Sequence, residues 1–386
     1  MGTPDNHKED CVSSRGPLVA VADAASVPGG RVLSALVGTA RRQRWATPVA
    51  IAPARGEVTG AQWRLSACDN PLLARYLTGV DTLVWVADSA DLQTTLAEPP
   101  SRRRDRVTRT AHSIITAAVA AGVPRLVVVT SAMVLGARRD NPLPLPEDAP
   151  RRAEPGDGVL GDLLVVEEQL EQARNQFPGL AITVVRPAAL VGPGIDTVVT
   201  RHFEAPRLLT IKGAEPAWQF CHVDDLASSV ALVVRAGLEL GPGRDAAPTG
   251  PLAALAQAPA VAVGCPGWLS QEQVERLSAM RRVQLSHATA LGTAQRLHRV
   301  GLLPAPASEL ALTTYPWVID PALLEAAGWT AAYDNETCLG VLLETIRGCS
   351  AVAARRIDRK DAAFGAASAA VALIGTAAAV RRSRRR

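Results

Sequence analysis

Short apolar runs alternate with longer helical patterns along the first half of the chain. The apolar runs lie at 18–22, 49–52, 82–87, 125–130 and 181–185, and the helical patterns at 29–37, 71–77, 107–121 and 163–176. A basic connector, SRRRDR, stands before the pattern at 107–121. Strands without polar alternation, each followed by a helix, are what a parallel sheet covered on both faces requires. The sequence therefore predicts an α/β fold built on a doubly wound parallel sheet.

Composition narrows the classes of function. Hydrophobic residues make up 48% of the 386 residues and charged residues 20%, which is typical of a globular protein. The net charge of +4 comes largely from the arginines at 381–386, so the folded body gives little support to nucleic-acid binding. The six cysteines are scattered without a C-x-x-C pair. Neither a metal site nor a disulfide framework is predicted.

The two ends of the chain differ from its body. Residues 1–16 are polar and no apolar leader follows Met1, which favours a cytoplasmic protein. Residues 362–380 form an uncharged stretch of 19 residues between basic flanks. One interpretation is membrane contact through 362–386, because that length just spans a bilayer. The other is an Ala-rich helix with a solubilising basic end.

The first strand is followed by a degraded phosphate-binding turn. In a sheet of this kind a dinucleotide lies at the carboxyl ends of the strands, and glycines let the backbone approach its pyrophosphate. The turn here reads VADAASVPGGRV, with Asp23 and Ser26 where glycines are expected. The Asp23 carboxylate would repel a phosphate. The cofactor-facing candidates are Ala22, Ser26, Val27 and Gly29, although an ordinary strand-turn-helix would show the same residues.

The second strand lacks the acidic residue that would hold an adenosine ribose. The segment PVAIAPAR offers Arg55 instead. An arginine at this place favours the 2′-phosphate of NADP over NAD. The alternative is a plain surface arginine.

Several segments, in order, resemble a known family. They are GVDTLVWVA (79–87), GVPRLVVVTSAMVLG (122–136), PLPEDAP (144–150), ITVVRPAALVGPG (182–194), WQFCHVDDLASSV (218–230) and DPALLEAAGWTAAYDNETCLGVLLETIR (320–347). The chain is similar to extended short-chain dehydrogenases/reductases, the NAD(P)-dependent epimerase/dehydratase family that includes UDP-sugar 4-epimerases, and it resembles a degenerate member. The resemblance covers about residues 17–348 and implies a Rossmann fold.

The resemblance also implies an organisation and a set of cofactor contacts. We expect a polar extension (1–16), a dinucleotide-binding domain (17–196), a substrate lobe interleaved with late Rossmann elements (197–348) and an Ala-rich helix with a basic tail (349–386). Ala87 and Pro187 match positions that line an NAD or NADP cofactor in relatives. Relatives pair into homodimers through two helices, which match 107–121 and 163–176 here.

The residues that do the family's chemistry are missing. In relatives a tyrosine, four residues before a lysine, transfers the proton, and a serine positions the substrate hydroxyl. Ser131 matches the serine, or simply terminates its strand. Val159 and Leu163 stand in the places of the tyrosine and lysine. No tyrosine or lysine occurs elsewhere in the motif, since the chain has only Tyr76, Tyr315, Tyr333, Lys8, Lys212 and Lys360.

Acidic residues near the motif have two interpretations. Asp157, Asp162 or Glu167 becomes an unconventional base if desolvation raises its pKa. Asp162 is also placed to begin and cap a helix, with Asp157 in the glycine-rich loop before it. His222, Asp224 and Asp225 are expected to anchor a helix start. In the lobe Arg201, His202, Arg207 and Lys212 either bind a diphosphate or are surface charge.

Two hypotheses of function follow. The first is a homologue with weakened or lost oxidoreductase or epimerase chemistry that still binds NAD(P), a nucleotide or a nucleotide sugar. The second is an active enzyme on a sugar nucleotide or another alcohol, which uses Ser131 with an atypical base.

Overall fold

The protein is built around one seven-stranded parallel sheet, which confirms the predicted doubly wound α/β fold. The computed structural model describes residues 16–240, 249–299, 306–347, 349–352 and 355–358. The strand order is β11-β6-β5-β4-β1-β2-β3. In chain order the strands are β1 (Val19–Ala22), β2 (Val49–Ala52), β3 (Gln62–Leu65), β4 (Thr82–Val86), β5 (Arg125–Val129), β6 (Ala181–Pro187) and β11 (Ala260–Val263).

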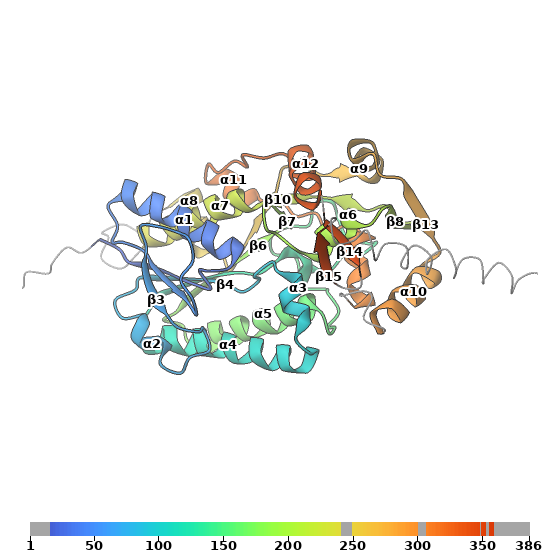
Figure 1. Ribbon diagram of the computed structural model, residues 1–386. Coiled ribbons are helices and arrows are strands. Elements are labelled where there is room, and N and C mark those ends of the chain that lie inside the picture. The colour runs from blue at the N-terminus through green and yellow to red at the C-terminus, as the bar shows by residue number, and fades with distance from the viewer. Residues whose placement is uncertain (1–15, 241–248, 300–305, 348, 353–354, 359–386) are drawn as a thin grey trace, which may run out of the picture.

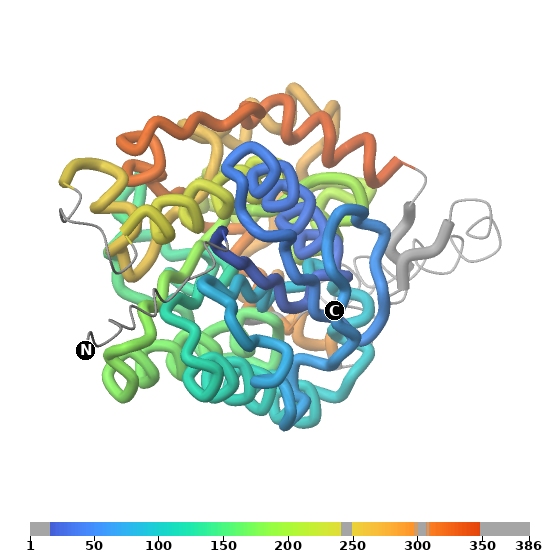
Figure 2. Tube along the Cα trace, turned by 90° about the vertical axis from the view of Figure 1, so that its left-hand side faces the viewer, coloured from blue at the N-terminus to red at the C-terminus, as the bar shows by residue number. Residues whose placement is uncertain are grey.

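Helices cover both faces of the sheet (Figure 1). One face packs against α1 (Val27–Gln43), α7 (Val223–Glu239) and α8 (Pro251–Gln257), and the other against α2 (Leu73–Tyr76), α4 (Pro100–Ala120) and α5 (Val159–Gln176). Alternate residues of each strand face opposite layers, so that Val19 and Val21 join one apolar cluster and Ala20 and Ala22 the other. The view turned by 90° shows α4 and α5 opposite α1 (Figure 2). Burial on both faces explains the unbroken apolar runs.

The basic connector expected before residue 107 is wrong. Helix α4 begins at Pro100, so SRRRDR forms its first turns. Proline suits the first turn of a helix because it needs no amide hydrogen there. Arg103 and Arg104 are held by Asp162 of α5, and arginine is a good helix former.

The two edge strands of the sheet, β11 and β3, differ in what contacts their outer side. At one edge the Glu147 carboxylate accepts a hydrogen bond from the amide of Ala262 in β11, at 3.0 Å. At the other edge lies β3, which the apolar pattern did not predict because it alternates with polar residues and is mostly exposed. Among the described strands, β3 pairs with β2 alone.

A smaller lobe follows β6 and sits at the carboxyl end of the sheet (Figure 1). Three two-stranded pairs lie here, β7 (Ala189–Val191) with β10 (Phe220–His222), β8 (Leu208–Ile211) with β13 (Arg282–Leu285), and β9 (Ala217–Trp218) with β12 (Leu269–Ser270). The accompanying helices are α6 (Val198–Glu204), α9 (Gln271–Ser278), α10 (His287–Arg299), η2 (Ala307–Thr313), α11 (Ala322–Ala326) and α12 (Asn335–Ile346).

The remaining described elements are short. They are α3 (Leu92–Ala97), η1 (Ala132–Leu135), and the strand pair β14 (Cys349–Val352) and β15 (Arg355–Asp358). Residues 1–15 of the expected N-terminal extension and residues 359–386 of the expected tail lie outside the described residues. Among the residues that are described, no helix has the length and apolar character that a membrane crossing needs.

Candidate functional site

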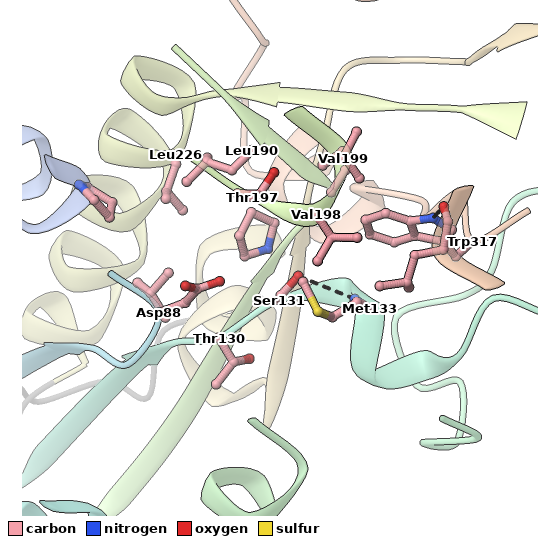
Figure 3. A pocket seen from close by; sticks show the side chains of 16 residues that line it. Asp88, Thr130, Ser131, Met133, Leu190, Thr197, Val198, Val199, Leu226 and Trp317 are labelled. Carbon is pink, nitrogen blue, oxygen red and sulfur yellow. Dashed lines mark hydrogen bonds between the residues drawn. The ribbon is translucent and has the colours of Figure 1, made fainter. Parts of the chain in front are cut away.

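A narrow pocket lies at the carboxyl ends of β4, β5 and β6, beneath the smaller lobe (Figure 3). Its wall is mostly apolar, with four polar side chains. The lining residues are Pro28, Asp88, Val129, Thr130, Ser131, Met133, Pro187, Ala188, Ala189, Leu190, Thr197, Val198, Val199, Leu226, Leu312 and Trp317. The space inside it that water reaches is about 20 Å³, which is room for about one water molecule.

Ser131, the predicted substrate-positioning serine, lines this pocket. It lies two residues after the end of β5 and caps the short helix η1, where its Oγ accepts a hydrogen bond from the Met133 amide at 3.3 Å. The neighbouring Thr130 donates its hydroxyl to Glu167 Oε1 at 2.8 Å. Glu167 is therefore tied into the sheet and also pairs with Arg186 at 2.6 Å. Glu167 holds β5, β6 and α5 together and does not face the pocket.

Asp88 is the ionisable residue of the pocket wall. It follows β4, immediately after the predicted contact Ala87, and its side chain is directed into the pocket (Figure 3). Burial raises the pKa of the Asp88 carboxyl above its ordinary value. One oxygen, Oδ1, accepts a hydrogen bond from the Ala90 amide at 2.9 Å. The segment that resembles the family ends at Ala87, so the resemblance does not point to Asp88 as a site residue.

The turn after β1 adopts the shape that glycines normally give it. Asp23 occupies the left-handed region with φ 60°, where aspartate is tolerated better than most residues. Ser26 caps helix α1, and its Oγ both donates to the Asp23 carbonyl at 2.8 Å and accepts from the Gly29 amide at 3.2 Å. A Cβ on Gly29 would collide with the Asp23 carbonyl. Gly29 therefore serves close packing of the turn.

This turn fits the pyrophosphate of a dinucleotide poorly. The first turn of α1 would supply amide donors to phosphate, but Pro28 has no amide hydrogen and Ser26 already takes the one on Gly29. Burial, with a smaller contribution from the charge of Asp88, raises the pKa of Asp23 to about 6. Asp23 and Asp88 thus bring two carboxyl groups to the ends of the adjacent strands β1 and β4. Both would repel an anionic ligand.

The other predicted cofactor contacts are scattered. Pro187 lines the pocket, and Ala22 is the buried last residue of β1. Val27 is partly exposed and packs near Gly194. Arg55 lies exposed after β2 and is absent from the pocket wall.

The positions that the sequence analysis matched to the family's tyrosine and lysine lie at the start of α5. Val159 is its first residue, and Leu163 is buried in the core. The glycine before them, Gly158, has no side chain to cap the helix. Glu309 of η2 supplies that cap from the lobe, since its Oε1 accepts the Leu160 amide at 3.1 Å.

Glu309 is a buried carboxyl that the sequence did not single out. It is 1% exposed, and its second oxygen, Oε2, has no hydrogen-bond partner among the described residues. Burial raises the pKa of Glu309 to about 7. Leu312 and Trp317, from the same segment, line the pocket. The hydrogen bond of Glu309 therefore connects the segment that carries Leu312 and Trp317 to α5.

Asp162 is structural rather than catalytic in this arrangement. It lies in the first turn of α5 and pairs with Arg103 at 2.5 Å and with Arg104 at 2.6 Å. Gly158, not Asp162, is the cap residue, which corrects the predicted helix start. Arg103 also donates to the carbonyl of Asp157, so this pair fixes the loop before the helix.

The expected anchoring role of His222 is confirmed. Its Nδ1 accepts the Asp224 amide at the start of α7, and its ring stacks on Tyr333 with centroids 3.7 Å apart. Asp225 accepts amides of Ala332 and Tyr333, joining α7 to the segment before α12.

Two of the four polar landmarks in the lobe are internal. Arg201 is paired with Asp196 at 2.6 Å, and His202 stacks on Trp218 with burial lowering its pKa to about 4. Arg207 and Lys212 are exposed. Within the described part of the chain, no three His, Cys, Asp or Glu residues cluster as a metal site would require.

Comparison with known proteins identifies relatives of this fold. The sequence model of the NAD dependent epimerase/dehydratase family matches residues 35–245. An uncharacterized protein of Mycobacterium tuberculosis is 24% identical over 225 residues, which is 57% of this chain and 60% of that protein. The chain thus spans about 60% of the length of this relative.

Solved structures extend the likeness over most of the chain. A UDP-glucose 4-epimerase from Thermotoga maritima, solved with UDP-glucose, has a TM-score of 0.57 and 15% identity, covering 86% of this chain and 98% of its own. A dTDP-glucose 4,6-dehydratase from Streptomyces venezuelae, solved with NAD, has a TM-score of 0.58 and 16% identity, covering 86% of this chain and 97% of its own. Likeness at this identity establishes the fold.

Proposed function

Because the chain belongs to the NAD dependent epimerase/dehydratase family, we propose that it is a ligand-binding member whose oxidoreductase or epimerase chemistry is weakened or lost. One observation carries this proposal, namely that Val159 and Leu163 occupy the places of the family's tyrosine and lysine. Neither side chain transfers a proton. General acid–base catalysis contributes about 100-fold or more to rate.

The turn after β1 supports the same proposal. Binding of NAD(P) at this turn requires amide donors and no opposing charge. Here Ser26 takes the Gly29 amide, and Asp23 brings a carboxylate to the turn. We therefore propose that affinity for NAD(P) is low.

The ligand site includes the pocket beside Ser131, whose inner space has room for about one water molecule, so most of a larger ligand would lie outside it. Solved neighbours contain UDP-glucose or NAD, which supports a nucleotide-sugar compound as one candidate class of ligand. Of the predicted lobe residues, Arg201 is already paired, whereas Arg207 and Lys212 are exposed and could contact a diphosphate. Homodimerisation through α4 and α5, and membrane contact through 362–386, stay predictions.

The second candidate is an active enzyme with an atypical base. Asp88 favours it, because this carboxyl shares the pocket with Ser131 and has a raised pKa. A raised pKa makes a carboxyl better able to exchange a proton in general acid–base work than an ordinary, fully ionised aspartate.

Calorimetry of the full chain with NAD, NADH, NADP and NADPH tests the proposal. We expect no binding at micromolar cofactor. Micromolar binding, together with NAD-dependent turnover of UDP-glucose that Ser131→Ala abolishes, would establish the second candidate instead. Ser34→Ala, on the exposed side of α1, is the matched control, because it removes a hydroxyl far from the pocket wall.

A further inference from the structure

The pocket beside Ser131 contains a carboxylate and no basic side chain. Of the 16 residues that line it, Asp88 alone is ionisable. The remaining polar groups are the hydroxyls of Thr130, Ser131 and Thr197, whose oxygens accept hydrogen bonds. Every other lining residue is apolar. This wall offers acceptors and negative charge to whatever enters.

Among the described residues, no basic side chain forms an ion pair with Asp88. Its one described hydrogen bond comes from the Ala90 amide. The groups whose pKa the Asp88 charge raises are themselves carboxyls, Asp23 and Glu309. Arg106, the cation that acts on Asp23, is already paired with Glu98 at 2.9 Å. A desolvated, unpaired carboxylate is costly, and a cation beside it removes that cost.

The free space has the size of a small head group. About 20 Å³ suits one water molecule, and a primary ammonium group is of similar size. Such a group donates three hydrogen bonds, which matches the Asp88 carboxylate and the neighbouring hydroxyls. The apolar wall towards Trp317 suits a short organic substituent (Figure 3).

We propose that this pocket binds a small primary amine in its ammonium form, with Asp88 as the counter-ion. The inference rests on the proposed function, because it takes the pocket to be a ligand site in a chain that binds NAD(P) weakly. In the family, the turn after β1 binds an anionic pyrophosphate. Here the proposed ligand is a cation, and it binds at the end of the neighbouring strand β4.

Thermal unfolding of the full chain in methylammonium chloride tests the inference. The controls are tetramethylammonium chloride and sodium chloride at the same ionic strength, because neither donates a hydrogen bond and the first is too bulky. A ligand that binds only the folded chain raises its stability with concentration. We expect methylammonium to raise the unfolding midpoint by about 1 °C or more beyond both controls at 100 mM, an estimate for a millimolar ligand.

The variant Asp88→Asn isolates the charge. Asparagine keeps an acceptor for the Ala90 amide, and we expect the methylammonium-specific shift to disappear. Glu168→Gln removes one exposed negative charge from α5 and should leave the shift intact. Equal midpoints in methylammonium and tetramethylammonium for the wild type would overturn the inference, whether or not the variant folds. A shift retained in Asp88→Asn would also overturn it.

The outcome is separable from that of the proposed function. Methylammonium selectivity together with micromolar NAD(P) binding would overturn the proposed weak cofactor binding and leave the amine site standing. Absence of both kinds of binding would overturn the amine site alone.

Discussion

Gly158 and Glu309 fit against each other at the start of α5, although they are far apart in the sequence. A Cβ on Gly158 would overlap the Glu309 carboxylate, which caps the helix through the Leu160 amide. Because Gly158 has no side chain, the Glu309 carboxylate can reach the Leu160 amide and connect the smaller lobe to α5.

Replacing Gly158 by alanine should weaken this connection. We expect Gly158→Ala to lower the free energy of unfolding by about 1–3 kcal/mol, because the carboxylate must move and release the Leu160 amide. Urea unfolding measures it. Gly340→Ala is the control, since nothing lies within 4 Å of its added Cβ in the interior of α12 and alanine there should stabilise by up to about 1 kcal/mol. Equal effects of the two substitutions would contradict the described contact.

The pH dependence of stability should report Glu309. Burial raises its pKa from 4.5 to about 7, so between these values the folded chain holds a proton that the unfolded chain has released. Stability contributed by this group is then present below about pH 4.5 and is lost as the pH rises to about 7. We expect Glu309→Gln to be more stable than the wild type at pH 8, by an amount on the order of 1–3 kcal/mol.

The quantity that tests this is the difference in unfolding free energy between Glu309→Gln and the wild type at each pH. Burial also raises the pKa values of Asp23 and Glu147, and these two groups change the stability of both proteins with pH in the same direction. Glu309→Gln and the wild type should converge near pH 4. A constant gap between their unfolding free energies from pH 4 to 8 would argue against a raised pKa.

The ion pair between Arg103 and Asp162 should be essential to the fold. The Arg103 and Asp162 side chains are 1% and 6% exposed. Removing Arg103 leaves the buried Asp162 carboxylate with Arg104 as its remaining cation and the Asp157 carbonyl without the Arg103 donor. Arg103→Ala should cost about 3–5 kcal/mol of stability. Its exposed neighbour supplies the control, for which Arg102→Ala should stay within about 0.5 kcal/mol. Chemical denaturation of both variants decides this, and a small loss for Arg103→Ala would refute the structural role.

Restoring the glycines of the turn should restore cofactor affinity. In the double variant Asp23→Gly/Ser26→Gly the carboxylate is removed and the Gly29 amide is freed. We expect NAD or NADP to bind at least about tenfold more tightly than to the wild type, a gain of about 1.4 kcal/mol. Calorimetry measures the gain, and Asp23→Asn alone separates the effect of charge from that of shape. Unchanged affinity in the double variant would show that the turn is not the obstacle.

The sequence predicted the sheet because burial on both faces leaves an uninterrupted local pattern. The strands around Val21, Val84 and Val127 were found within a residue or two of their ends. Strand β3 was missed, since an exposed edge strand has no such pattern. The start of α4 was misplaced because Arg103 is buried by a partner 59 residues away.

The site was only partly predictable for the same reason. Ser131 follows a recognisable strand, so the local sequence places it. Glu309 reaches α5 across 149 residues, and no local pattern announces that contact. Asp88 follows a buried strand, and its position alone does not show that it faces a pocket.

The hydrogen bond between Glu147 and Ala262 has a consequence for self-association. It occupies a backbone donor on the outer side of β11, and an occupied donor cannot recruit a strand from another molecule. The opposite border offers no such protection, because β3 pairs on one side alone and its Leu65 is 57% exposed. If another molecule adds a strand to this sheet, we expect that strand to pair with β3 and not with β11.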